Sequence, residues 1–130
     1  MVSLLAWAHG RKRSFGYAIK GLYALYGETN ARIHAAATVL VIALGAGLGL
    51  SPLDWTLLAI AATVVWVAEA LNTALEALSD AAVPEHSPHI AVAKDVAAGA
   101  VLLASLGAVA VGLLVFVPHL AARLSGLHFG

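Results

Sequence analysis

Three acidic residues and one amide recur at helical spacing in the stretch EALNTALEALSD, residues 69–80. At about 100° per residue, the side chains of Glu69, Asn72, Glu76 and Asp80 fall within about 80° of one another on a helix. This polar stripe could simply bond neighbouring helices. Carboxylates lack hydrogen-bond donors, however, so they join helices poorly and bind cations well. We therefore interpret the stripe as a functional site.

The ligands available at this stripe are hard oxygens, because the chain contains no cysteine. Such a set favours Mg²⁺ or Ca²⁺ over zinc, and Mg²⁺ usually takes one or two carboxylates plus water and substrate phosphate. We expect Glu28, Lys94 and Asp95 at the same membrane level as the stripe. Several carboxylates and one ammonium would then converge, which is typical of phosphoryl transfer, where a metal ion and Lys neutralise phosphate charge.

The elements that position these residues are expected to lie in a membrane. Of the 130 residues, 62% are hydrophobic and only 11% are charged. A soluble domain is typically about half apolar and about a quarter charged, and a domain this short leaves much of its surface in water. The formal net charge is zero, which gives no basic field for nucleic acid. We predict an all-α integral membrane protein.

A single domain over residues 1–130 is expected to contain four helical segments. Residues 3–28 mix basic with aromatic and aliphatic side chains, which predicts an amphipathic helix lying in the membrane surface; a disordered basic tail is the alternative. Transmembrane helices are expected over residues 33–50, 55–80 and 93–117. Asp54 is the expected N-cap of the second of these, and Pro118 is expected to end the third.

The distribution of Lys and Arg predicts the orientation. Six basic residues fall on one side of the predicted membrane and only Arg123 on the other; the six are Arg11, Lys12, Arg13, Lys20, Arg32 and Lys94. Positive residues stay in the cytoplasm, so the N-terminus and the 81–93 loop are expected there. Glu69 would then lie in the cytoplasmic third of the hydrocarbon, and Glu76 near the inner headgroups. A carboxyl group inside hydrocarbon costs several kcal/mol unless paired, hydrated or protonated.

EALNTALEALSD and AKDVAAGAVLL, with ETNARIH upstream, resemble the motifs of the small bacterial lipid kinases of the diacylglycerol kinase and undecaprenol kinase family. The resemblance runs from about residue 13 to residue 117, and ETNARIH and AKDVAAGAVL are more similar to the undecaprenol kinase branch. It implies an ATP- and Mg²⁺-dependent enzyme of the bacterial cytoplasmic (inner) membrane. That enzyme would phosphorylate undecaprenol or diacylglycerol, giving undecaprenyl phosphate or phosphatidic acid. The resemblance also implies a homotrimer with active sites shared between neighbouring subunits.

The same resemblance implies a role for each candidate residue. Glu28 and Glu76 would hold the Mg²⁺ that bridges the ATP phosphates. Glu69 would be the general base that takes the proton of the lipid hydroxyl, and Asn72 would orient Glu69 or the substrate. Lys94 would contact the β- and γ-phosphates. The other residues implied at the nucleotide site are Arg13, Tyr17, Asp80, Glu85 and Asp95.

The loop before the last predicted helix departs from the family. Where the family often has a histidine directly before a proline, this chain has Ser87 before Pro88, and His86 lies one position earlier. A nucleoside contact by that histidine is therefore not carried over. His86 and His89 have the i, i+3 spacing of a metal pair. Since no third ligand is evident, we expect an ordinary solvated loop.

Two other functions remain open at this point. A small proton or ion transporter is one, because intramembrane Glu residues often mark proton paths. Such a path should place ionisable groups through the whole thickness, whereas the outer half of each predicted span lacks them apart from Asp54. A non-catalytic subunit of a larger membrane complex is the other, and it predicts no activity of the chain alone.

Overall fold

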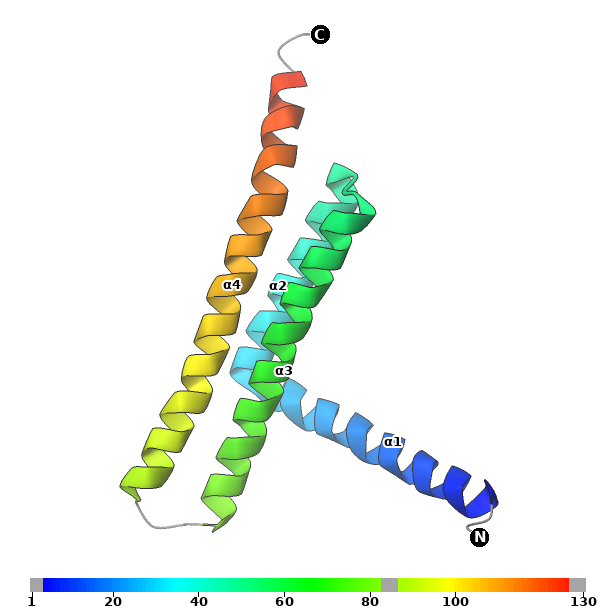
Figure 1. Cartoon of the computed structure of the whole chain (residues 1–130), viewed down its shortest axis with the longest axis vertical. Helices are drawn as coiled ribbons and strands as arrows, with labels where there is room; N and C mark the ends of the chain where they lie inside the picture. Colours follow the sequence, from blue (N-terminus) through cyan, green and yellow to red (C-terminus); the bar gives the residue numbers. More distant parts are fainter. Residues whose placement is uncertain (1–3, 83–86, 127–130) are drawn as a thin grey trace.

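Four α-helices make up a computed structural model that describes residues 4–82 and 87–126, with side chains described over 13–82 and 87–126. They are α1 (Leu4–Gly27), α2 (Thr29–Leu48), α3 (Pro52–Ala82) and α4 (Pro88–Gly126). Helices α2, α3 and α4 run alongside one another, and α1 leaves them at a wide angle (Figure 1). No strand occurs in these described ranges, so the predicted all-α fold is confirmed.

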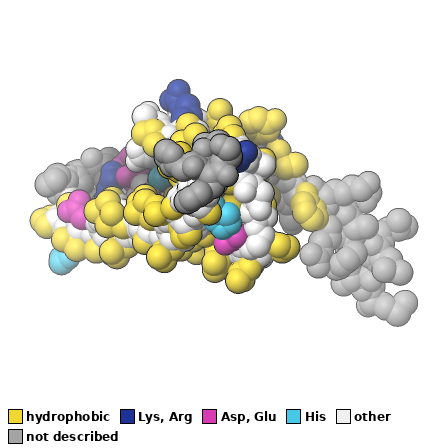
Figure 2. Space-filling model, turned by 90° about the horizontal axis from the view of Figure 1, so that it is seen from above, with side chains coloured by type: hydrophobic (Ala, Val, Ile, Leu, Met, Phe, Trp, Pro, Cys, Tyr) yellow, Lys and Arg dark blue, Asp and Glu magenta, His cyan; other side chains and the backbone are white. Residues whose placement is uncertain are grey.

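Helices α2, α3 and α4 are each long and apolar enough to cross a membrane. They contain 20, 31 and 39 residues, or about 30, 46 and 58 Å of helix. The hydrocarbon core is about 30 Å thick, so α2 matches it while α3 and α4 extend beyond it. Hydrophobic side chains form most of the described surface seen in Figure 2. The predicted three-span membrane protein is confirmed.

A single extended residue separates α1 from α2. Glu28 has φ −75° and ψ 142° and occupies the N-cap position of α2. Its amide donates to the Leu25 carbonyl (3.0 Å), and its carbonyl accepts from the Arg32 amide (3.2 Å). The Arg32 guanidinium donates to the Gly27 carbonyl at 3.2 Å. A carboxylate at a helix N-terminus is favoured by the helix dipole, so Glu28 marks the corner where the chain enters the membrane bundle.

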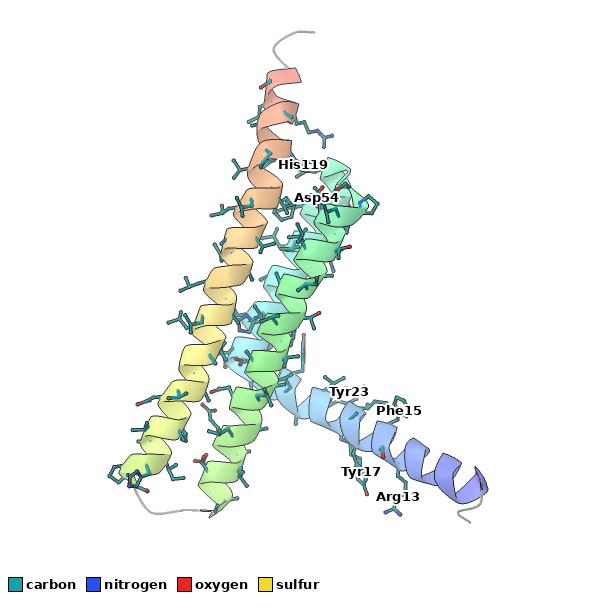
Figure 3. All side chains as sticks on the ribbon, in the orientation of Figure 1. Arg13, Phe15, Tyr17, Tyr23, Asp54 and His119 are labelled. Carbon is teal, nitrogen blue, oxygen red and sulfur yellow. The ribbon has the colours of Figure 1, made fainter. Side chains whose placement is uncertain are left out.

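Helix α1 has an apolar and a polar face, as the sequence predicts for a surface helix. At about 100° per residue, five of its large apolar side chains share one face about 100° wide; they are Phe15, Ile19, Leu22, Tyr23 and Tyr26. Figure 3 shows Phe15 and Tyr23 on one side of the helix and Arg13 and Tyr17 on the other. Arg13 and Tyr17 therefore point toward the side of the molecule on which α3 and α4 are connected (Figure 1).

The α2–α3 turn is closed by local hydrogen bonds. Gly49, with φ +68°, ends α2 in the left-handed conformation that glycine adopts readily. Ser51 precedes α3, and its amide donates to Asp54 Oδ2 (3.0 Å) while the Asp54 amide donates to Ser51 Oγ (3.2 Å). This reciprocal pair is a capping box. The prediction of Asp54 as N-cap is therefore wrong by three positions, because Pro52 is already the first helical residue, a place that proline favours.

Helices α2 and α3 approach each other closely beside this turn. A Cβ atom added to Gly45 would lie 2.7 Å from the nearest ring atom of Trp55. Leu50 and Leu58 form a buried apolar cluster with Val115 of α4, and Trp55 packs against it. Since only glycine leaves room for the indole, Gly45 sets the spacing between α2 and α3 at this end.

Helix α4 is longer than predicted at both ends. It begins at Pro88 rather than near residue 93 and continues through Pro118 to Gly126. Proline is tolerated in the first turn of a helix, and in apolar surroundings a helix continues past an internal proline because neighbouring groups satisfy the freed backbone. Beside Pro118, the His119 ring is hydrogen-bonded through Nδ1 to the Val115 carbonyl at 2.8 Å.

The outer part of α4 is tied to the α2–α3 turn. His119 Nε2 lies 3.5 Å from Asp54 Oδ2, and Figure 3 shows the two side chains near each other where the helices meet. The Arg123 guanidinium donates to the Gly47 carbonyl. These contacts and the apolar cluster fix one end of the bundle, and the polar stripe predicted on α3 lies toward the other.

Candidate functional site

A cavity of about 300 Å³ lies between α2, α3 and α4. Its polar lining consists of Asn30 and His34 from α2, Glu69, Asn72 and Glu76 from α3, and Ser105 from α4. The α2 residues belong to the first two turns of that helix, beside the corner at which α1 leaves. The structure therefore brings three of the four stripe residues into one open cavity near the corner between α1 and α2.

Glu69 is the most buried polar residue of the site. It is 1% exposed, and it is the largest fully buried side chain in the described structure. Its Oε2 atom has no hydrogen-bond partner among the described residues, and the nearest basic group is His34 Nε2 at 3.8 Å. A buried charge without partners is costly. A hydrogen-bond donor or a cation bound in the cavity would therefore stabilise the Glu69 carboxylate.

Asn72 and Glu76 lie one and two turns further along α3. The Asn72 side-chain amide donates to Glu76 Oε1 at 3.4 Å. Asn72 is 6% exposed, and its Oδ1 atom is buried without a partner in the described chain. Asn72 is thus bonded to Glu76 rather than to Glu69, and it keeps a free acceptor. The three residues run from the buried Glu69 to the half-buried Glu76.

Asp80, the fourth residue of the predicted stripe, does not line the cavity. Its carboxylate accepts a hydrogen bond from Lys94 Nζ at 3.0 Å, and 73% of its side chain is exposed. This ion pair joins the last turns of α3 to the first turns of α4. One further helical turn takes Asp80 past the cavity, and Lys94 is directed to Asp80 rather than to the cavity.

The other predicted site residues are also apart from the cavity within one chain. Glu28 and Asp95 are exposed, and neither lines the cavity. Arg13 and Tyr17 lie on the polar face of α1 (Figure 3). Glu85 falls outside the described residues, as does His86. Over the described ranges, no three His, Asp or Glu residues lie close enough to hold a metal ion together.

Three polar residues of the cavity were missed by the sequence reasoning: Asn30, His34 and Ser105. Asn30 and His34 stand four positions apart in ETNARIH, a spacing that places them on one face of a helix. That spacing is the sequence feature that could have identified Asn30 and His34 as neighbours in a site. Ser105 is a lone hydroxyl in an apolar span, and nothing in its local sequence distinguishes it.

Fold and site together define a small helical membrane protein with an acidic cavity beside the corner where α1 meets α2. The sequence model of the prokaryotic diacylglycerol kinase family matches residues 16–116. The chain belongs to this family of lipid kinases.

Two curated relatives are similar to this chain over most of its length. A protein from Synechocystis named diacylglycerol kinase is 42% identical over 109 residues, which cover 82% of this chain and 62% of that protein. A protein from Bacillus subtilis named undecaprenol kinase is 35% identical over 109 residues, which cover 83% of this chain and 89% of that protein. The match thus spans less than two thirds of the Synechocystis relative.

Proposed function

We propose that this chain is an ATP- and Mg²⁺-dependent lipid kinase that transfers the γ-phosphate of ATP to the hydroxyl of a membrane lipid alcohol. The observation that carries the proposal is the buried, unpartnered carboxyl group of Glu69 in a cavity between membrane helices. Family membership supplies the reaction class. The relatives are named for two different alcohols, so undecaprenol and diacylglycerol are both candidate acceptors.

Glu69 is the proposed general base. It would take the hydroxyl proton while the alcohol oxygen forms a bond to the γ-phosphorus and ADP leaves. A positioned base typically contributes about 10²- to 10⁴-fold in rate. Asn72 Oδ1 is a buried acceptor beside it without a partner among the described residues, and it suits a hydroxyl donor. Asn72 would thus orient the alcohol at the start of the reaction, and it would not orient Glu69.

The depth of Glu69 suits a lipid alcohol that meets a water-soluble phosphate donor. Glu69 lies beside His34, which is about 7.5 Å inside the end of α2. Glu76 is two helical turns from Glu69 in the direction of that end, which places it about level with the first residue of α2. A hydroxyl at headgroup depth would reach Glu69, and phosphates at the interface would reach Glu76.

The donor set of the proposed site fits Mg²⁺. Glu76 is half-buried at the cavity and Glu28 is exposed at the α1–α2 corner, and both offer hard carboxylate oxygens. One or two carboxylates suffice for Mg²⁺, since phosphate oxygens and water complete its shell. When bound with ATP, the ion would neutralise charge on the phosphates. Glu28 and Glu76 would hold it, and the half-buried position of Glu76 would keep bulk water from one side of it.

The nucleotide would lie outside the cavity, between α1 and the first turns of α4. Lys94 is proposed to exchange Asp80 for the β- and γ-phosphates when ATP binds. Arg13 and Tyr17 face the same side of the molecule from α1 (Figure 3). Asp95 and Glu85 are proposed to contact the nucleotide, as the family resemblance implies.

We propose a homotrimer in the bacterial inner membrane, with the N-terminus in the cytoplasm. One observation supports an oligomer: Glu28, a proposed magnesium ligand, does not line the cavity of its own chain. Neighbouring subunits would bring the missing carboxylate to each cavity. The excess of Lys and Arg on the α1 side supports the orientation.

The direct test is a phosphate-transfer assay with the purified protein in lipid bilayers, labelled ATP, and undecaprenol and diacylglycerol offered side by side. We expect Mg²⁺-dependent labelling of one or both alcohols. The Glu76→Gln variant should stay folded and lose the use of Mg²⁺-ATP. Lipid labelling by folded Glu76→Gln at the wild-type rate would contradict the metal role. Ion flux in sealed vesicles without any lipid labelling would favour a transporter instead.

A further inference from the structure

His34 is the described basic side chain nearest to the proposed base. Its Nε2 atom lies 3.8 Å from Glu69 Oε2, and its side chain is 18% exposed where that of Glu69 is 2% exposed. Within the described ranges, no other Lys, Arg or His lies within ion-pair distance of Glu69. His34 also lines the same cavity. It is therefore the basic side chain of α2 that is placed to act on the Glu69 carboxylate.

His34 has neighbours on both α2 and α3. Its backbone carbonyl accepts a hydrogen bond from Thr38 Oγ1 at 2.7 Å. Thr38 Oγ1 in turn accepts from Trp66 Nε1 on α3 at 3.2 Å. The Trp66 ring meets the His34 ring edge-on, with centroids 6.4 Å apart. Trp66 lies one turn before Glu69, so the ring that meets the imidazole comes from the same part of α3 as the base.

The separation of 3.8 Å is longer than a hydrogen bond, which needs about 2.7–3.2 Å. A movement of about 1 Å would close it, and catalytic hydrogen bonds are often long in free enzymes and tighten with substrate bound. The buried Oε2 atom has no other partner in the described chain. Leaving such an acceptor unpaired is unfavourable, which favours that movement.

The geometry points to His34 as the positioning residue of this kinase, a role that rests on the proposed function. Its Nε2–H would donate to Glu69 Oε2 and hold the carboxylate in one orientation. The other oxygen, Oε1, would then receive the proton of the lipid hydroxyl. His34 forms no bond to either substrate, so it acts on the rate only through Glu69.

A matched set of substitutions tests this role. In His34→Gln the side-chain amide can replace the Nε2–H donor, whereas His34→Met keeps the approximate volume without a donor. We expect kcat to fall about tenfold to a hundredfold in His34→Met, since a lost hydrogen bond and a misplaced base act together. The KM values for ATP and for the lipid should stay within about twofold of wild type. His34→Gln should recover most of the lost kcat.

Two controls separate positioning from folding. His89→Met changes an exposed histidine that does not line the cavity, and it should leave kcat unchanged. In a Glu69→Gln background, His34→Met should cause no further loss, because residues that act as a unit are not additive. If His34→Met does not fold, His34→Asn replaces it: its shorter amide cannot reach Glu69, so it should be as slow as expected for His34→Met.

The outcomes also separate this inference from the proposed function. If the wild type phosphorylates lipid and Glu69→Gln does not, the kinase proposal holds. A kcat for His34→Met or His34→Asn equal to wild type would then overturn the His34 role alone. Equal losses in His34→Gln and His34→Met would overturn it too, since the donor would not matter. A wild type that labels neither alcohol would refute the kinase proposal and this inference with it.

Discussion

Lys94 contacts Asp80 in the structure, whereas the proposed function assigns it to the phosphates of ATP. Substitutions at the two positions can distinguish these partners. In the structure its ammonium pairs with Asp80 at 3.0 Å, with 36% of the Lys94 side chain and 73% of the Asp80 side chain exposed. Exposed ion pairs contribute about 0.2–1 kcal/mol. If Lys94 serves only this pair, Lys94→Met and Asp80→Asn should cause the same small loss of stability and little change in activity.

A phosphate contact predicts a different magnitude. A hydrogen bond to a charged group is worth about 1.5–3 kcal/mol, so Lys94→Met should lower kcat/KM for ATP roughly tenfold to more than a hundredfold. Asp80→Asn, in contrast, frees the ammonium for the phosphates and should change kcat/KM by less than about fivefold. The two variants remove the same ion pair, so their difference isolates the contact with ATP.

The assay is the initial rate of lipid phosphorylation over a range of ATP concentrations at saturating lipid, with thermal unfolding of each variant in the same bilayer or detergent. Melting temperatures should fall by similar small amounts in both variants. Rates for Lys94→Met and Asp80→Asn that agree within twofold would show that the ammonium has no partner beyond Asp80. The assignment of Lys94 to the phosphates would then be withdrawn.

Two further variants test the base and the packing. Glu69→Gln should lower turnover about 10²- to 10⁴-fold while binding of a fluorescent ATP analogue is kept; loss of nucleotide binding instead would make Glu69 a ligand rather than a base. Gly45→Ala should destabilise the fold by about 1–3 kcal/mol, because the new Cβ would lie 2.7 Å from the Trp55 ring. Gly47→Ala is the matched control on the same helix, since nothing lies within 4 Å of its Cβ, and equal melting temperatures would contradict the close approach.

The amino-acid sequence predicts the helices of this chain better than it predicts the residues at which they end. The charge-free span before Ser51 and the apolar spans after it were recognised because lipid requires long uninterrupted apolar helices. Pro118 predicts a helix end, yet α4 continues to Gly126. A proline signals a break where water can replace the lost hydrogen bond, and that signal is weaker where the surroundings are apolar.

For the site, helical periodicity identifies the cavity residues of α3 and does not identify the residues of α2 and α4 on the other sides of the cavity. Glu69, Asn72 and Glu76 share one face of α3 by spacing alone, and all three line the cavity. His34 was not singled out, because its significance comes from a contact between residues 35 positions apart. Asp80 fits the same spacing but lies one turn too far along the helix, which no periodicity reveals.

The sequence by itself determined that this chain forms membrane helices with one acidic face, because apolar length and the 3.6-residue helical repeat are local properties. Its motifs also determined the family. Only the tertiary structure decided which of the predicted side chains share a cavity, that Lys94 pairs with Asp80, and that His34 faces Glu69. Those facts depend on the axial offset between neighbouring helices and on the rotation of each helix about its own axis. Both are set by packing such as that of Trp55 on Gly45.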